Sequence, residues 1–363
     1  MKLGRKGHRV TNAALVATIC YGAFMGSAEA QSSVQLYGQI DEWVGAQKFP
    51  GNQRAWGVLG GGMSTSYWGM KGREDLGGGY QAIFALESFF RAQNGQSGRF
   101  QGDTFFARNA YVGILSPYGT LTAGRMTSNL FVSTILFNPF VDSYQFSPMI
   151  LHTYLGTSTF PAYRTDQGAI GDSGWSNAVS WSSPNFSGLS ASTMYAFGNG
   201  AGEGGQHKDS AQLLYVNNAF AATVVYQYVN YKNVANDFLT PGSANVVAGL
   251  RSQSIGQLGV SYNFRIIRFY GQYMYTGNSV VTGNYHVSTG QFGFTVPVGV
   301  GTIMASYVYS KDTGGFDQNR KTWAIGYDYP LSKRTDVYAA YLGDKISGES
   351  YGDTFGVGIR AKF

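Results

Sequence analysis

The segment 354–363 constrains the fold most, because its side chains alternate strictly between apolar and polar or small types. Successive residues of a strand point to opposite faces, so this segment has two distinct faces. One face carries Phe355, Val357, Ile359, Ala361 and Phe363, and the other carries Gly356, Gly358, Arg360 and Lys362. A tilted strand of about 9–11 residues crosses a hydrocarbon core. A lone strand would leave its backbone groups unpaired in lipid, so the pattern requires a closed barrel.

The N-terminus is typical of a secretory signal peptide. Four basic residues lie among the first ten, an apolar run covers 13–25, and Ser27-Ala28-Glu29-Ala30 follows. This order predicts cleavage after Ala30, leaving 31–363 as the barrel domain. The run is well short of the roughly 20 apolar residues of a spanning helix. The single cysteine, Cys20, lies within it, so the mature chain is expected to contain no disulfide.

The composition fits an exported β-barrel better than a soluble or nucleic-acid-binding protein. The chain has 51 glycines, 26 tyrosines and 24 phenylalanines, but only 13% charged residues. No stretch after residue 30 holds 18 uninterrupted apolar residues, which excludes a typical spanning helix. Removing 1–30 takes four basic residues and Glu29 from totals of 26 and 20, so the net charge falls from +6 to +3. No basic run remains, and no nucleic-acid partner is expected.

Alternating segments recur along the whole chain at the spacing of a meander. Short turns alternate with longer loops, as in outer-membrane barrels with tight periplasmic and long external connections. Glycine-rich 57–62 and polar 93–102 are interpreted as such connections. A soluble sandwich would need fewer strands and more Leu and Val. We therefore predict an all-β, sixteen-stranded antiparallel transmembrane barrel, with strands near 34–41, 66–72, 80–91, 105–115, 120–125, 177–183, 189–197, 210–216, 221–231, 253–264, 269–277, 286–297, 302–311, 321–330, 335–343 and 354–363.

The alternation stops between Met126 and Trp175. This segment of about fifty residues contains scattered prolines, many aromatic residues and few charges. A connection of this length is rarely without function in a compact fold. Two interpretations remain open on the residues alone, namely an external surface loop or a loop that folds back into the lumen.

Several motifs resemble the general diffusion porins of Gram-negative bacteria, in particular their beta-proteobacterial branch. The likeness covers the mature chain, and the motifs occur in the family's order. They are Ser66-Tyr-Trp-Gly-Met-Lys-Gly-Arg-Glu-Asp-Leu-Gly-Gly-Gly79, Phe84-Ala-Leu-Glu87, Arg108-Asn-Ala-Tyr-Val-Gly113, Gly119-Thr-Leu-Thr-Ala-Gly-Arg125, Ser183-Pro-Asn-Phe-Ser-Gly188, Leu331-Ser-Lys-Arg-Thr335 and Gly356-Val-Gly-Ile-Arg-Ala-Lys-Phe363. The resemblance implies a homotrimer of sixteen-stranded barrels, with the third external loop, here 126–175, folded inward.

The resemblance also implies a narrow point where wall arginines face acidic residues of that loop. Arg108 matches a wall arginine and is expected in phase with Ala110 and Val112 on the lumen face. Glu87 matches the family's lumen acid, and Asp142 is the best candidate for the loop acid. Tyr67 and Gly174 stand where the family usually has arginine, which argues against strong anion selectivity.

Further residues complete the predicted pore constriction. Lys71 and Arg91 lie on lumen faces of their strands, and Arg125 either meets solutes or pins the long loop. Opposed charges would create a transverse field that favours polar solutes. In the alternative interpretation, each of these charged side chains only pairs with neighbouring lumen groups, far from the constriction. Nine tyrosines are interpreted as interfacial girdles rather than a sugar path: Tyr262, Tyr273, Tyr275, Tyr307, Tyr309, Tyr327, Tyr329, Tyr338 and Tyr341.

The predicted function is passive diffusion of small hydrophilic solutes and ions through a water-filled pore in the outer membrane. Its partners are those solutes, outer-membrane lipid and two further copies in a homotrimer. We expect no enzymatic activity, cofactor or metal, because the three mature histidines lack metal-ligand spacing and no nucleophile motif is present. The alternatives are a substrate-selective channel of the same fold and a non-conducting adhesion or recognition barrel.

Overall fold

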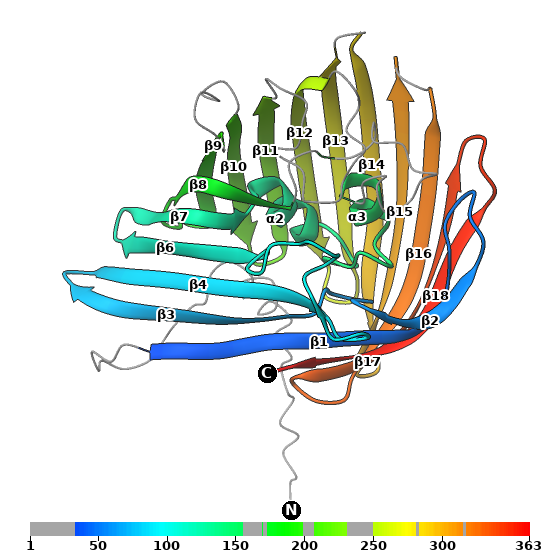
Figure 1. Cartoon of the computed structure of the whole chain (residues 1–363), viewed down its shortest axis with the longest axis horizontal. Helices are drawn as coiled ribbons and strands as arrows, with labels where there is room; N and C mark the ends of the chain where they lie inside the picture. Colours follow the sequence, from blue (N-terminus) through cyan, green and yellow to red (C-terminus); the bar gives the residue numbers. More distant parts are fainter. Residues whose placement is uncertain are drawn as a thin grey trace, which may run out of the picture. The chain divides into compact units, whose positions relative to one another are not determined.

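The computed structural model describes residues 33–154, 169, 173–198, 207–230, 250–280, 283–314 and 317–363. The predicted signal peptide, 1–30, lies outside these residues. The described chain consists mainly of antiparallel strands (Figure 1). The elements are β1 Ser33–Lys48, β2 Ala55–Gly60, β3 Tyr67–Gly77, β4 Tyr80–Arg91, β5 Gln96–Ser97, β6 Asn109–Ser116, β7 Gly119–Thr127, α2 Asn129–Leu136, α3 Pro148–Thr153, β8 Gly174–Ser182, β9 Leu189–Phe197, β10 His207–Asn217, β11 Phe220–Asn230, β12 Leu250–Asn263, β13 Arg268–Val280, β14 Tyr285–Val298, β15 Gly301–Thr313, β16 Asn319–Pro330, β17 Thr335–Ile346 and β18 Gly352–Lys362.

The first and last strands close the sheet into a ring. Ser33–Gln39 of β1 pairs with β3, whereas Gln39–Lys48 pairs with β18. The sheet has eighteen strands, but β2 pairs only with the part of β1 that β3 does not reach, and the two-residue β5 pairs only with the end of β4, so sixteen strands form the barrel. This confirms the predicted sixteen-stranded antiparallel barrel. The predictions missed β2 within the glycine-rich connection and β5 within the polar one, and they began β6 too early, since it starts at Asn109.

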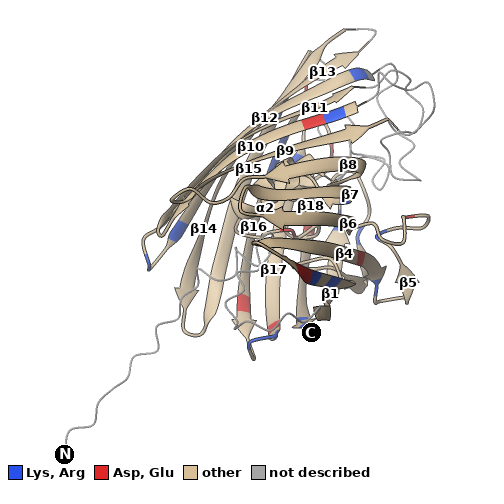
Figure 2. Ribbon diagram, turned by 90° about the vertical axis from the view of Figure 1, so that its left-hand side faces the viewer, with Lys and Arg blue, Asp and Glu red and all other residues tan. Residues whose placement is uncertain are grey.

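The two faces of the wall differ in chemistry, as the alternation predicts. In β18, Val357 and Ile359 are 61% and 49% exposed on the outer face. Arg360 points inward, where its guanidinium lies 3.1 Å from the Asp336 carboxylate. Charged side chains are sparse along the strands (Figure 2). The apolar outer face thus suits lipid, and the polar inner face suits water.

The two ends of the barrel differ in the length of their connections. Gly78 and Gly79 alone join β3 to β4, whereas residues 128–173 join β7 to β8. Outer-membrane barrels have short periplasmic turns and longer external loops, which assigns the 128–173 end to the cell exterior. Among the described residues, no helix has the length and apolarity of a membrane span.

Candidate functional site

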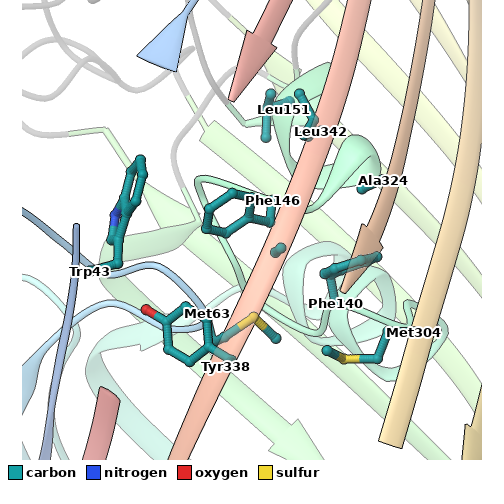
Figure 3. Close-up of a cluster of buried hydrophobic side chains, with 10 residues drawn as sticks. Trp43, Met63, Phe140, Phe146, Leu151, Met304, Ala324, Tyr338 and Leu342 are labelled. Atoms are coloured by element: carbon teal, nitrogen blue, oxygen red, sulfur yellow. The ribbon is translucent and has the colours of Figure 1, made fainter. Parts of the chain in front are cut away.

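Segment 128–154 packs against the inner face of the wall through an apolar cluster. Phe140, Phe146 and Leu151 of this segment are at most 2% exposed. Figure 3 shows them beside wall residues of β15–β17, including Met304 and Leu342. Each partner comes from an inward-facing strand position. Burial of these side chains therefore holds segment 128–154 against these strands.

Two wall glycines allow the segment to approach the strands closely. A Cβ atom added at Gly259 would lie 2.8 Å from the Phe137 ring, and one at Gly293 would lie 2.6 Å from Cγ of Pro139. Between these glycines, the Gln272 amide donates to the carbonyl oxygens of Thr134 at 3.0 Å and Phe137 at 2.8 Å. The absent side chains make room for the segment, and the glutamine satisfies its buried carbonyl groups.

The helix α3 is anchored by a buried polar network. Arg320 forms an ion pair with Asp344 at 2.8 Å and donates to the carbonyl oxygen of Leu151 at 3.0 Å. Nδ1 and Nε2 of His152 lie 2.6 and 2.7 Å from the hydroxyls of Ser310 and Thr322. His152 is one of the three mature histidines, for which the sequence predicted only the lack of metal-ligand spacing.

The network fixes the protonation state of His152. The Thr322 hydroxyl donates to Asp344 at 2.6 Å, so it accepts from Nε2–H of His152, and Nδ1 accepts from Ser310. Burial, and then the charge of Arg320, lower the pKa of His152 well below its ordinary value. The imidazole is therefore neutral when the segment is docked.

A second anchor involves Asp41, which the sequence analysis did not single out. Its carboxylate is fully buried and accepts the backbone N–H groups of Gly62 and Met63, each at 3.0 Å, and of Ser64 at 2.8 Å. The Tyr338 hydroxyl also donates to it. The connection between β2 and β3 is thereby held against the wall. Tyr338 is 4% exposed on the inner face, so its assignment to an interfacial girdle was wrong.

This connection positions the candidate loop acid. The Ser64 hydroxyl donates to Asp142 at 2.8 Å, and the Ser143 hydroxyl donates to the carbonyl oxygen of Gly62 at 2.5 Å. Asp142 and Ser143 lie between α2 and α3. Two external connections therefore meet at Asp142, and both are fixed to the wall.

Four of the predicted constriction residues form one cluster on the β1–β6 wall. Arg108 forms an ion pair with Glu87, which also accepts from Asn109 and from the Tyr37 hydroxyl. The Arg108 guanidinium lies 4.1 Å from the centre of the Tyr67 ring, and Lys71 Nζ lies 4.7 Å from that of Tyr37. We call Glu87, Arg108, Tyr67 and Lys71 the wall cluster.

The charges of Glu87 and Asp142 both reach Arg108. Burial opposes its positive charge, but Glu87, Tyr67 and Asp142, in decreasing order of effect, together outweigh burial and raise the pKa of Arg108 above its ordinary value. Tyr67, which stands in place of a family arginine, supports Arg108 through the cation–π contact instead.

The remaining predictions for this site require correction or lie elsewhere. Val112 is 63% exposed on the outer face, so Arg108 does not share an inner face with it. Arg108 precedes β6, which begins at Asn109, and the strand period does not extend to it. Arg125 donates to the carbonyl oxygen of Ala107 and to Ser176, at 2.5 and 2.8 Å. Arg91 contacts the carbonyl oxygen of Ser97 at 3.5 Å, away from the wall cluster.

A further inward charged group lies on β16–β18. The Arg360 guanidinium lies 3.3 Å from Asp328 and 3.1 Å from Asp336. Alternation in the sequence places Arg360 on the polar face of β18 but predicts no partner for it. Within the described ranges, no group of three or more His, Cys, Asp or Glu residues has the geometry of a metal site.

Comparisons with known proteins agree with this architecture. Residues 13–347 match the family model described as Gram-negative porin. An outer-membrane porin of Bordetella pertussis is 30% identical, with 96% of this chain and 99% of that protein covered. Outer membrane porin protein 32 of Delftia acidovorans is 29% identical, over 94% of this chain and 90% of its own length.

The solved structures give the same fold. The anion-selective porin from Comamonas acidovorans superposes with a TM-score of 0.74 at 24% identity, covering 92% of this chain and all of that one. OmpT of Vibrio cholerae reaches 0.65 at 14% identity. The closed barrel, its inner and outer faces and these matches lead to one conclusion: the chain belongs to the family of Gram-negative outer-membrane porins.

Proposed function

We propose that segment 126–175 narrows the pore of this porin and that solutes pass between Asp142 and the wall cluster. Passive diffusion of small hydrophilic solutes through the outer membrane is the activity of this family. The single observation that carries the proposal is the docking of residues 128–154 on the inner wall. Fixed by Arg320 and Asp41, the segment sets a size limit without needing a moving gate.

The charges at this point support only a weak ionic preference. Glu87 neutralises Arg108 in a direct ion pair, and the remaining positive charge of the wall cluster, on Lys71, is equal in number to the negative charge of Asp142. Tyr67 and Gly174 add no positive charge where arginines are common in the family. The opposed charges retain a transverse field that favours polar solutes over apolar ones.

The rest of the proposed function concerns assembly and chemistry. The pore works as a homotrimer, which cyclic symmetry within one membrane plane would suit. It uses no cofactor and carries out no enzymatic reaction, since diffusion down a gradient needs neither.

Planar-bilayer recording of the purified protein tests the proposal. We expect ohmic conductance steps grouped in threes and a small reversal potential in a KCl gradient. Block of the current by one sugar or organic acid at low concentration would instead indicate a substrate-selective channel. Folded protein without any conductance would contradict the diffusion pore and favour an adhesion or recognition barrel.

A further inference from the structure

Two lysines face each other directly on the outer wall. Lys321 of β16 and Lys345 of β17 are paired positions in the antiparallel register, and both side chains are exposed. Like charges directly opposite across strands are unfavourable. Repulsion between the two ammonium groups therefore destabilises the protein unless an anion lies between them.

The described chain supplies no such anion. Within 283–314 and 317–363, neither lysine forms an ion pair, and the Lys345 ammonium donates to the backbone carbonyl of Glu349 rather than to a carboxylate. Arg54, by contrast, has an acidic partner, because its guanidinium lies 2.6 Å from the Asp353 carboxylate. The two lysines are therefore available to an external anion.

Lys321 and Lys345 lie at the membrane depth of the lipid headgroups. Both lysines lie at the end of the barrel that carries the long connections, which is the external end. An aromatic row begins just inside them, with the Trp323 and Tyr341 rings 5.2 Å apart. Aromatic belts mark the boundary between headgroups and hydrocarbon.

Along the outer face of β16, a charged residue is followed by an aromatic and then an aliphatic residue. Lys321, Trp323 and Ile325 alternate on one face, and the last two are 42% and 49% exposed. The Lys321 Nζ also lies 5.9 Å from the centre of the Tyr309 ring. Charge, aromatic ring and aliphatic side chain thus follow one another in the order of a lipid's headgroup, interface and acyl chain.

We propose that Lys321 and Lys345 bind the phosphate of a phosphorylated lipid headgroup in the outer leaflet, while its acyl chains lie against Trp323 and Ile325. The phosphate would relieve the repulsion between the lysines, and basic residues near a membrane surface attract anionic lipid. The acyl contact distinguishes this ligand from free phosphate, because only a lipid gains from both parts of the surface.

The test uses the full mature protein in phosphatidylcholine nanodiscs that contain lipid A, a phosphorylated glycolipid. Native mass spectrometry counts the lipid A retained by wild type, by Lys321→Gln/Lys345→Gln and by Lys333→Gln/Arg334→Gln. The control pair removes the same charge from the exposed turn between β16 and β17 at the opposite end. Planar-bilayer conductance shows that each variant is folded.

We expect the Lys321/Lys345 variant to retain at least about tenfold less lipid A than wild type. The control variant should match wild type, and dephosphorylated lipid A should not bind in preference to phosphatidylcholine. Equal retention by the two variants would overturn the proposal. Displacement of lipid A by millimolar inorganic phosphate would overturn the assignment to lipid, and a change of oligomeric state instead of lipid content would show that the lysines contact another copy.

Discussion

Removal of the Asp142 charge should shift the ion selectivity of the pore toward anions. An ion that passes about 5 Å from this carboxylate interacts with it by about 0.8 kcal/mol in bulk water, and screening in 0.1 M salt reduces this to about 0.5 kcal/mol. Cations lose this attraction and anions lose an equal repulsion in Asp142→Asn. The cation-to-anion permeability ratio should therefore fall by a factor of about five.

The assay is the reversal potential of single pores in a tenfold KCl gradient. A fivefold change in the ratio from near unity moves it by about 30 mV toward the Cl⁻ equilibrium potential. Asparagine keeps an oxygen that accepts from the Ser64 hydroxyl, so the loop contact at 2.8 Å is preserved. The expected change is therefore electrostatic rather than structural.

Asp75→Asn is the matched control, because it removes the same charge from an exposed position at the periplasmic end of β3. Its reversal potential should stay within a few millivolts of wild type. An equally small shift in Asp142→Asn would refute the reasoning, since it would place Asp142 outside the ion path.

Two further predictions concern the docking of segment 128–154. His152 is neutral and its pKa is lowered when docked, so below pH of about 6.5 a released segment takes up a proton that the docked one does not, and docking weakens by up to about 1.4 kcal/mol per pH unit. Current noise should therefore rise between pH 7 and pH 5 in wild type and rise less in His152→Gln; the same rise in both would exclude His152 as the cause. Gly259→Ala should destabilise the docked state by about 1–3 kcal/mol through its contact with Phe137, whereas Gly256→Ala, which meets no atom within 4 Å, should be neutral. Thermal unfolding and current noise of the two variants check this, and equal behaviour would mean that Phe137 moves aside without cost.

The strands were predictable because lipid imposes one rule on every residue of the wall. Val357 and Ile359 must contact hydrocarbon and Arg360 must avoid it, so period two is visible in the sequence. The rule stops where the ring ends. β2 pairs only with the part of β1 that β3 does not reach and consists partly of glycines, and Arg108 precedes the first paired residue of β6, so neither follows from alternation.

The anchors of the long segment were not predictable, because they join distant parts of the chain without a local pattern. Asp41 binds backbone N–H groups about twenty residues later, and His152 contacts Ser310 and Thr322 on two other strands. Tyr338 lies on the inward face of β17 with Asp336 and Ala340, which distinguishes it from the outward girdle tyrosines, but its bond to Asp41 does not follow from this alternation. Polar pairing in a lumen depends on three-dimensional proximity, which a single sequence does not contain.

The inner wall resolves an apparent conflict between apolar lumen residues and a water-filled pore. Met304, Ala324 and Leu342 face inward on β15–β17, where exposed apolar groups would disfavour water. Phe140 and Phe146 of the long segment cover them, so this part of the wall forms the apolar docking surface of the segment (Figure 3). The wall cluster on β3, β4 and the residue before β6 is charged instead. The division of the inner face into an apolar docking surface and a charged cluster therefore determines where the segment docks, and in the proposed function it leaves the charged cluster facing the solutes.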